Sequence, residues 1–263
     1  MGNFLSVFKG LYMSFGMFCT IPLPGYWDES GTKHMMPWFP LVGALIGFIW
    51  WGLAIGLVFL GNWVPAPLLA GVFMLIPLLF AGFIHLDGFM DTSDAILSRR
   101  SIDEKMRILK DSHTGAFAVI MVAILFIMQY AASLSVFMQE TNFALLIMIP
   151  IVSRSFSALS ILCIRPMNPD GYAAVFRPDS PAVHRIVTLV DLIIVFVLAW
   201  FIFGLPGLIV GGAVAVGFSV AMLCALKSFN FKGVSGDLAG FSLTIAEVCG
   251  IIAIAIIIVG GYV

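Results

Sequence analysis

The sequence predicts an all-α fold: a polytopic membrane helical bundle that forms a single domain over residues 1–263. Three observations support this prediction. The mean hydropathy is +1.10, and 61% of the residues are hydrophobic whereas only 10% are charged. Apolar runs of about 20 residues, the length that a helix needs to cross a bilayer, recur along the chain. The alternating pattern of a membrane β-barrel is absent, so helices must satisfy the backbone groups in lipid.

The apolar windows define the expected elements in chain order. Residues 3–21 are a mixed apolar stretch with one lysine, which favours an interfacial or partly inserted helix. The windows that follow are each long enough to cross about 30 Å of hydrocarbon. They lie at 38–61, 64–84, 116–138, 143–164, 186–203, 205–226 and 241–262. We therefore expect about seven transmembrane spans after an N-terminal helix at the membrane surface.

The connections between these spans differ in length and charge. Long polar connections at 22–37, 85–115, 165–185 and 227–240 alternate with short turns. Every Lys and Arg outside the spans lies in the N-terminal segment or a long connection, and the positive-inside rule places that side in the cytoplasm. The sequence therefore predicts a multi-pass protein of the cytoplasmic membrane with a polar catalytic cap on its cytoplasmic face. The net charge of −1 argues against a nucleic-acid partner.

The stretch "HLDGFMDTSDA" (85–95) places three carboxylates on one side of a helix. Asp87, Asp91 and Asp94, here called the aspartate row, are spaced i, i+4, i+7. A helix that continues from the span 64–84 would hold them at the membrane surface. Like charges at this spacing repel one another, and Mg²⁺, which takes a few carboxylates plus water and substrate phosphates, is the expected compensating ion. The alternative is a solvated helical face whose aspartates pair with Arg99, Arg100 or Lys105.

The stretch "LKDSHTGAF" (109–117) lies at the entrance to the next span. Lys110 offers a cation for phosphate and Asp111 a further carboxylate, while Ser112 and Thr114 can cap the helix that begins near Gly115. The free N–H groups of a helix N-terminus attract phosphate. The alternative is a plain N-cap that joins a surface loop to a span.

The stretch "FKGVSGDLAGF" (231–241) precedes the last span on the same predicted side. Gly236 and its neighbouring glycines allow the backbone to approach a ligand, Ser235 can donate to phosphate, and Asp237 is a fourth candidate carboxylate. The segment 165–178 contains two arginines and turn-forming residues, which predicts an ordered loop that contacts an anionic substrate or lipid headgroups.

Two ionisable residues, Arg154 and Glu247, lie within predicted spans. Such residues usually face a bundle interior or a polar cavity. They are expected either to pair with each other or to line the site. Asp191 lies in another span and has no obvious partner in the sequence.

The quoted segments resemble one known family. The likeness rests on "FPLVGALIG" (39–47), "HLDGFMDTSDA", "LKDSHTGAF" and "KGVSGDLAG" (232–240), in the family's order and spacing, and on "TIPLP" (20–24). The chain thereby resembles the cobalamin synthases, also called adenosylcobinamide-GDP ribazoletransferases. Ala95, Ser235 and Thr244 stand where other residues are common in that family.

The resemblance implies a reaction, a metal and a set of site residues. α-Ribazole or its 5′-phosphate attacks the cobinamide-linked phosphate of adenosylcobinamide-GDP, which yields adenosylcobalamin or its phosphate and releases GMP. Mg²⁺ is the implied metal, with Asp87, Asp91, Asp94 and Asp111 as ligands and Lys110 and Asp237 completing the catalytic set. The residues expected to contact substrate are His85, Gly88, Arg99, Arg100, Ser112, Arg154, Ser235, Gly236 and Glu247.

Two other interpretations remain open at this point. A CDP-alcohol phosphotransferase also transfers a phosphoryl group at a membrane surface, but its Asp-Gly-x-x-Ala-Arg element is not matched after Asp87 and Gly88. A secondary transporter would use Arg154, Asp191 and Glu247 as a midplane site, whereas most acidic residues here collect in the predicted cap.

Overall fold

The computed structural model describes residues 2–24, 28–111, 113–139 and 142–260, and the side chains from residue 6 onward within them. Within this part the regular elements are all helices, apart from a lone β-bridge between Pro166 and Val234. The elements are α1 (Gly2–Phe18), α2 (Glu29–Thr32), η1 (Met36–Trp38), α3 (Phe39–Leu60), α4 (Ala66–Phe80), α5 (Ile84–Leu97), α6 (Ile102–Ile108), α7 (Ala116–Phe137), η2 (Phe143–Ile147), α8 (Met148–Cys163), α9 (Tyr172–Val175), α10 (Ala182–Phe203), α11 (Leu205–Ser228) and α12 (Gly236–Val259). The all-α prediction is confirmed.

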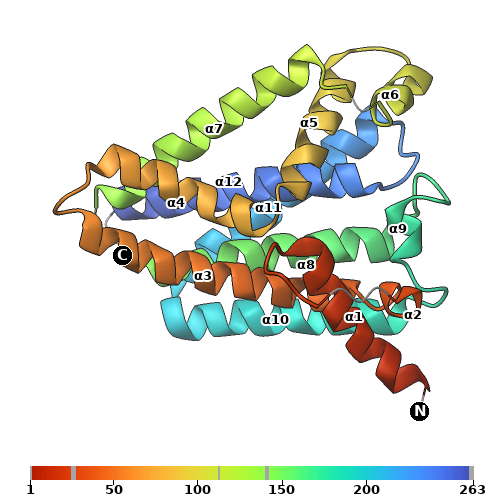
Figure 1. Cartoon of the computed structure of the whole chain (residues 1–263), viewed down its shortest axis with the longest axis horizontal. Coiled ribbons are helices and arrows are strands. Elements are labelled where there is room, and N and C mark those ends of the chain that lie inside the picture. The colour runs from red at the N-terminus through yellow and green to blue at the C-terminus, as the bar shows by residue number, and fades with distance from the viewer. Residues whose placement is uncertain (1, 25–27, 112, 140–141, 261–263) are drawn as a thin grey trace.

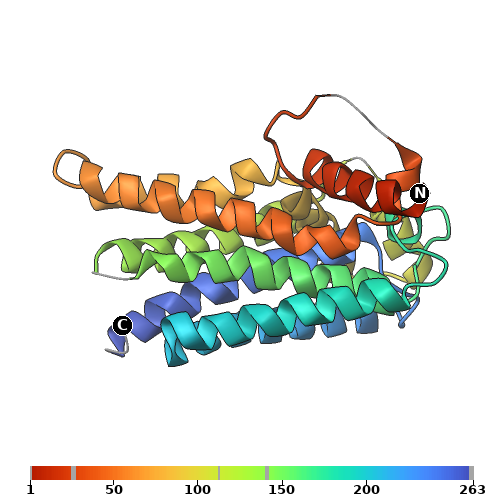
Figure 2. The ribbon, with the colours of Figure 1, turned by 90° about the horizontal axis from the view of Figure 1, so that it is seen from below.

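Long apolar helices make up the body of the molecule. Among the described residues, six helices are long and apolar enough to cross a membrane: α3 with η1, α7, α8 with η2, α10, α11 and α12. They run lengthwise through the molecule (Figure 1, Figure 2). The bent pair α4 and α5 counts as a seventh candidate if it is taken as one span. The protein is therefore a multi-pass membrane bundle, as the hydropathy predicts.

Helix α8 lies at the centre of this bundle. Of its span, 78% is buried inside the protein, against 11% for α10, which presents its Ile, Val and Leu side chains outward. Helix α8 contacts α3, α10, α11 and α12. Its buried serines donate back to the helix, as Ser155 Oγ does to the Ile151 carbonyl at 2.9 Å and Ser160 Oγ to the Ser157 carbonyl at 2.7 Å. These bonds satisfy polar groups that lipid would leave unpaired.

The predicted span 64–84 differs from the structure. Helix α4 ends at Phe80, and the chain turns by 93° before α5 begins at Ile84. Gly82 (φ +66°) and Phe83 (φ +59°) both adopt the left-handed conformation at this turn, and the Phe83 N–H closes it onto the Leu78 carbonyl at 3.1 Å. The prediction that one continuous helix holds the aspartate row is therefore wrong: α5 crosses the end of the bundle (Figure 1).

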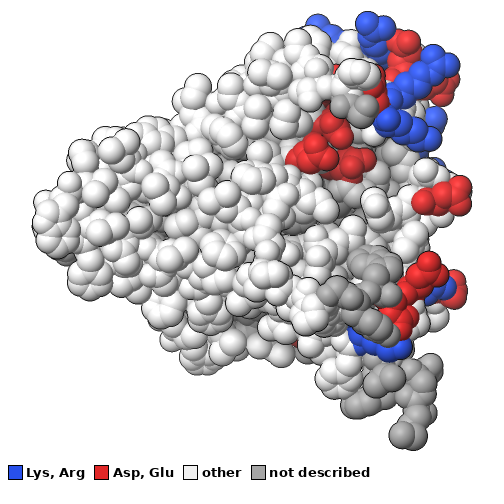
Figure 3. Space-filling view, viewed as in Figure 1, with Lys and Arg blue, Asp and Glu red and all other residues white. Residues whose placement is uncertain are grey.

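Charged side chains gather at one end of the bundle. On the face shown in Figure 3, Lys, Arg, Asp and Glu lie almost entirely at the end where α5, α6 and α9 are found. This distribution matches the predicted separation of charge between the two sides. Helix α5 belongs to this end, so we treat it as part of the polar cap and not as a spanning segment.

The N-terminal helix α1 packs beside the start of α3 and is not one of the six spanning helices. Lys9 of α1 forms an ion pair with Asp28 at 2.6 Å. The Trp38 indole donates to the Val7 carbonyl at 2.9 Å. Helix α1 is thus tied to the charged end of the bundle, as expected of an interfacial or partly inserted helix.

Candidate active site

The aspartate row meets the start of α12 where α5 crosses it. A Cβ atom added at Gly88 would lie 2.9 Å from both the Cα and the carbonyl oxygen of Asp237. Only glycine permits this backbone approach, because any side chain would force the helices apart. Gly88 lies between Asp87 and Asp91, so the crossing adds Asp237 to the row. Two segments that lie about 150 residues apart in the sequence therefore meet at their backbones.

The four carboxylates influence one another electrostatically. The pKa of Asp91 is raised from 3.8 to about 6, first by burial and then by repulsion from Asp87, Asp237 and Asp94. Asp87 is exposed, whereas Asp91, Asp94 and Asp237 are partly buried. A cluster of this kind favours any cation that can be shared between its members.

Basic side chains do not neutralise this cluster. Arg100 pairs with Glu104 at 2.8 Å, and the Lys105 amino group donates to the Ser228 carbonyl at 3.2 Å. Arg99 is exposed. Among the described residues, no Lys or Arg forms an ion pair with the aspartate row or Asp237. The alternative interpretation, a solvated face paired with these basic residues, is not what the structure shows.

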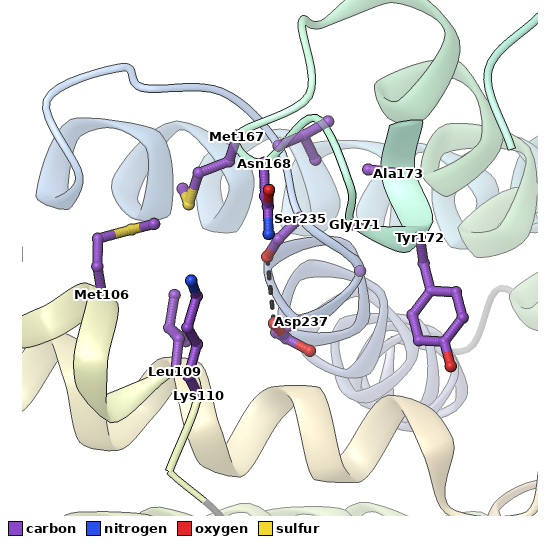
Figure 4. A pocket seen from close by; sticks show the side chains of 12 residues that line it. Met106, Leu109, Lys110, Met167, Asn168, Gly171, Tyr172, Ala173, Ser235 and Asp237 are labelled. Carbon is purple, nitrogen blue, oxygen red and sulfur yellow. Dashed lines mark hydrogen bonds between the residues drawn. The ribbon is translucent and has the colours of Figure 1, made fainter. Parts of the chain in front are cut away.

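A cavity of about 150 Å³, here called the Lys110 cavity, adjoins Asp237. Its polar lining groups come from three segments that lie far apart in the sequence (Figure 4). They are Lys110 after α6, Asn168 in the loop before α9, and Ser235, Gly236 and Asp237 at the start of α12. The arrangement combines a cation, an amide and a helix N-terminus, which suits a phosphate group.

Backbone pairing holds the walls of the Lys110 cavity together. The Val234 N–H donates to the Arg165 carbonyl, and the Met167 N–H donates to the Val234 carbonyl, both at 2.9 Å. Ser235 is the N-cap of α12, and its hydroxyl accepts from the Leu238 N–H at 3.2 Å. The loop 165–178, predicted to be ordered, thus contributes a wall.

The entrance to α7 differs in part from its prediction. The N-cap of α7 is Gly115 and has no side-chain capping bond, so Thr114 does not cap this helix. The Asp94 carboxylate lies where a side chain at position 115 would be, directly against Gly115. Asp111 is exposed and bonds to His113 at 2.7 Å, which lowers the pKa of Asp111. Ser112 lies outside the described residues.

Of three further predicted residues, His85 and Arg154 are buried and Glu247 is partly buried. His85 is buried beside the rings of Phe18 and Phe39, and burial, followed by the charge of Arg154, lowers its pKa well below 6.5. Arg154 and Glu247 pair at 2.5 Å, which is the pairing that the sequence offered as one of their two roles. Within the part of the chain that the structure describes, the lining of the Lys110 cavity does not include these three residues.

Comparison with known proteins finds relatives over nearly the whole chain. A family model described as cobalamin-5-phosphate synthase matches residues 10–255. The chain is 40% identical over 248 residues to an adenosylcobinamide-GDP ribazoletransferase of Clostridium botulinum (strain Alaska E43), covering 94% of this chain and 96% of that one. It is 36% identical over 251 residues to a protein of the same name from Clostridium perfringens (strain SM101), covering 95% and 98%. No solved structure matches it.

The chain belongs to the cobalamin-5-phosphate synthase family. The resemblance seen in the sequence is confirmed, and it sets aside the phosphotransferase and transporter interpretations. The motif segments "HLDGFMDTSDA" and "KGVSGDLAG" are the two that cross at Gly88 and Asp237.

The donor set of this family member fits Mg²⁺ in its chemistry. Among the described residues, no three His, Cys, Asp or Glu side chains are close enough to hold an ion by themselves. Mg²⁺ usually takes one or two carboxylates, several waters and the phosphates of a substrate. An open cluster of four carboxylates, Asp87, Asp91, Asp94 and Asp237, with the Lys110 cavity beside it, is compatible with that mode of binding.

Some residues of the site were not singled out from the sequence. Asn168, Tyr172 and Met167 line the Lys110 cavity, and the only signal was the turn-rich loop that contains them. Thr20 lies near the other end of the aspartate row, within the motif "TIPLP". Tertiary contacts, not local pattern, bring these residues to the site.

Proposed function

We propose that this chain joins adenosylcobinamide-GDP to α-ribazole, or to its 5′-phosphate, and releases GMP, the reaction named for its relatives. The observation that supports this most directly is the meeting of four carboxylates and Lys110 at the charged end of a membrane bundle. A reaction at a diphosphate needs both cation binding and a fixed cation.

The proposed reaction is a phosphoryl transfer that balances without a further reactant. A ribose hydroxyl oxygen of α-ribazole forms a bond to the cobinamide-linked phosphorus and gives its proton to a neighbouring carboxylate. The bond from this phosphorus to the bridging oxygen breaks, and GMP leaves with the electron pair. Positioning and charge neutralisation contribute most of the catalysis in such transfers.

The residues of the chain divide this work between them. Lys110 neutralises the phosphate of the leaving nucleotide, and the α12 N-terminus with Ser235 and Gly236 orients it. Asp87, Asp91, Asp94 and Asp237 hold Mg²⁺, which when bound supplies positive charge to the diphosphate.

The charged end is proposed to face the cytoplasm, where both substrates are soluble. The Lys and Arg asymmetry supports this orientation. Single cysteines in place of Arg100 and Asn62, on a cysteine-free background, would test it by membrane-impermeant labelling. Position 100 should be protected in intact cells and position 62 labelled, and the reverse pattern would contradict both the orientation and the access of substrate.

The activity is tested by incubating the purified protein with adenosylcobinamide-GDP, α-ribazole and Mg²⁺ and following GMP by chromatography. GMP release that requires both substrates and stops with a chelator is the expected result. Folded protein that releases no GMP with both acceptors would count against the proposal.

A further inference from the structure

The segment that follows α1 closes the break between α4 and α5. The Thr20 N–H donates to the Phe80 carbonyl at 2.9 Å, and the Thr20 hydroxyl donates to the Leu79 carbonyl at 3.0 Å. These carbonyls lie in the last turn of α4, and the Leu79 carbonyl also accepts from the Gly82 N–H at 3.2 Å. Figure 1 shows the end of α1 beside this junction. The start of the aspartate helix is therefore held by a segment about 60 residues away in sequence.

A groove of about 460 Å³, here called the Thr20 groove, lies at this junction and ends at Asp87. Its size is within the range of small-molecule sites. Its lining includes Met17, Cys19, Thr20, Phe83, Ile84 and Asp87. Among the described lining residues, Asp87 is the one carboxylate in a wall that also presents the ring of Phe83 and the sulfur atoms of Met17 and Cys19. Such walls favour the face and edge of an aromatic ring.

Phe83 is held in a conformation that its side chain disfavours. Its φ of +59° is left-handed, a region where a bulky residue costs free energy and glycine or asparagine does not. Its ring is nevertheless 43% exposed at the edge of the groove. Strain and an exposed aromatic ring together at one position suggest a contact made by a ligand.

The Thr20 groove and the Lys110 cavity are separate spaces that each border the carboxylate cluster. Among the described residues they share no lining side chain, yet each reaches one carboxylate, Asp87 in the groove and Asp237 in the cavity. Gly88, the neighbour of Asp87, touches Asp237. An in-line transfer needs separate places for its entering and leaving groups, and two spaces beside one cluster can supply them.

We propose that the Thr20 groove binds the aromatic base of the acceptor nucleoside, while the Lys110 cavity takes the departing nucleotide. This inference rests on the function proposed above. The base of α-ribazole is a benzimidazole, a bicyclic aromatic ring that can contact the Phe83 ring and the sulfur atoms of Met17 and Cys19. The ribose of a base held there would extend past Asp87 toward the carboxylate cluster.

Substitution of an exposed groove residue separates acceptor binding from donor binding. Ile84 is 38% exposed in the groove, and Val72 is 52% exposed on α4 outside it. Ile84→Trp should fill the groove and raise the KM for α-ribazole about tenfold, with the KM for adenosylcobinamide-GDP within about twofold of wild type. Val72→Trp is the matched control and should leave both constants unchanged. An unchanged acceptor KM, an equal rise in both KM values, or the same effect in the control would overturn the assignment.

A second variant tests the groove even if Ile84→Trp does not fold. Phe83→Asn keeps a residue that tolerates left-handed φ and removes the ring, so it should fold normally while the KM for α-ribazole rises about fivefold. Normal acceptor kinetics in this folded variant would contradict the role of Phe83.

Equilibrium dialysis of α-ribazole against the purified protein, without donor, makes the test independent of turnover. Saturable binding that both groove variants weaken supports the assignment, and binding that is absent or unaffected overturns it. If wild-type protein releases no GMP but binds α-ribazole in this way, the proposed reaction fails and the groove assignment stands.

Discussion

Removal of one charge at Asp91 should make the protein more stable and less active. In Asp91→Asn the side chain keeps its shape but can no longer be ionised. The pKa of Asp91, raised from 3.8 to about 6, corresponds at most to about 3 kcal/mol at about 1.4 kcal/mol per unit. The side chain is only partly buried, so solvent screening leaves about 1 kcal/mol. We expect the midpoint of thermal unfolding to rise by about 2–4 °C in metal-free buffer at pH 8.

The pH dependence of this gain follows from the direction of the shift. Because the folded protein holds the Asp91 proton more tightly than the unfolded chain does, wild-type stability falls as the pH rises from about 4 to about 6. Asp91→Asn lacks this fall. The two proteins should therefore differ in unfolding midpoint at pH 8 and converge as the pH is lowered through that window.

Stabilisation by Mg²⁺ and the rate of turnover should both be greater in wild type than in Asp91→Asn. Millimolar Mg²⁺ should raise the unfolding midpoint of wild type more than that of Asp91→Asn, and the variant should lose about 100-fold or more in GMP release. Asp103→Asn, whose side chain is 92% exposed on α6, is the matched control and should behave as wild type. A variant of Asp91 with normal turnover and unchanged Mg²⁺ dependence, or a stability gain that is independent of pH, would refute the role of Asp91.

Three further substitutions test the geometry of the site. Gly88→Ala should push α5 off α12, with a loss of about 1–3 kcal/mol in unfolding free energy and of most of the turnover. Gly71→Ala, with open space around it, is the control and should keep both stability and turnover. Equal effects of the two substitutions would contradict the close approach of Gly88 to Asp237. Lys110→Met should raise the KM for adenosylcobinamide-GDP about tenfold or more without changing that for α-ribazole, and a change confined to the acceptor would be inconsistent with the nucleotide assignment. Arg154→Leu alone should lower the unfolding free energy by about 3–5 kcal/mol, because it removes the ion-pair partner of Glu247 in the bundle. The double variant with Glu247→Leu should recover most of that stability and retain turnover. An inactive but stable double variant would place the pair in the reaction.

The sequence was sufficient for the features that depend on composition and local spacing. Apolar windows predict the spanning helices because lipid demands about 20 apolar residues from each. The Lys and Arg distribution predicts the charged end, and the i, i+4, i+7 spacing predicts the aspartate row. The meeting of this row with Asp237 could be anticipated from topology. The absence of a side chain at Gly88 allows the two backbones to come close enough.

Features that depend on distant contacts were not predictable in this way. Window 64–84 is apolar enough for one straight span, and Pro77 and Gly82 within it do not specify a turn of 93°. The turn is completed by bonds from Thr20. Asn168 likewise enters the Lys110 cavity only because the segment before α12 pairs with the loop after α8.

The turn between α4 and α5 has a direct consequence for catalysis at a membrane surface. A straight helix leaving the bundle along the direction of α4 would spread Asp87 to Asp94 over about 10 Å of depth, at about 1.5 Å per residue. After a turn of 93° the row lies across the end of the bundle, with its carboxylates at similar depth. Asp87 then reaches the Thr20 groove, and Asp94 reaches the start of α7 at Gly115. Asp91, between them, has both its row neighbours and Asp237 close enough to raise its pKa. The break that makes α4 too short to cross a membrane alone is thus what aligns the carboxylates with three neighbouring segments of the site.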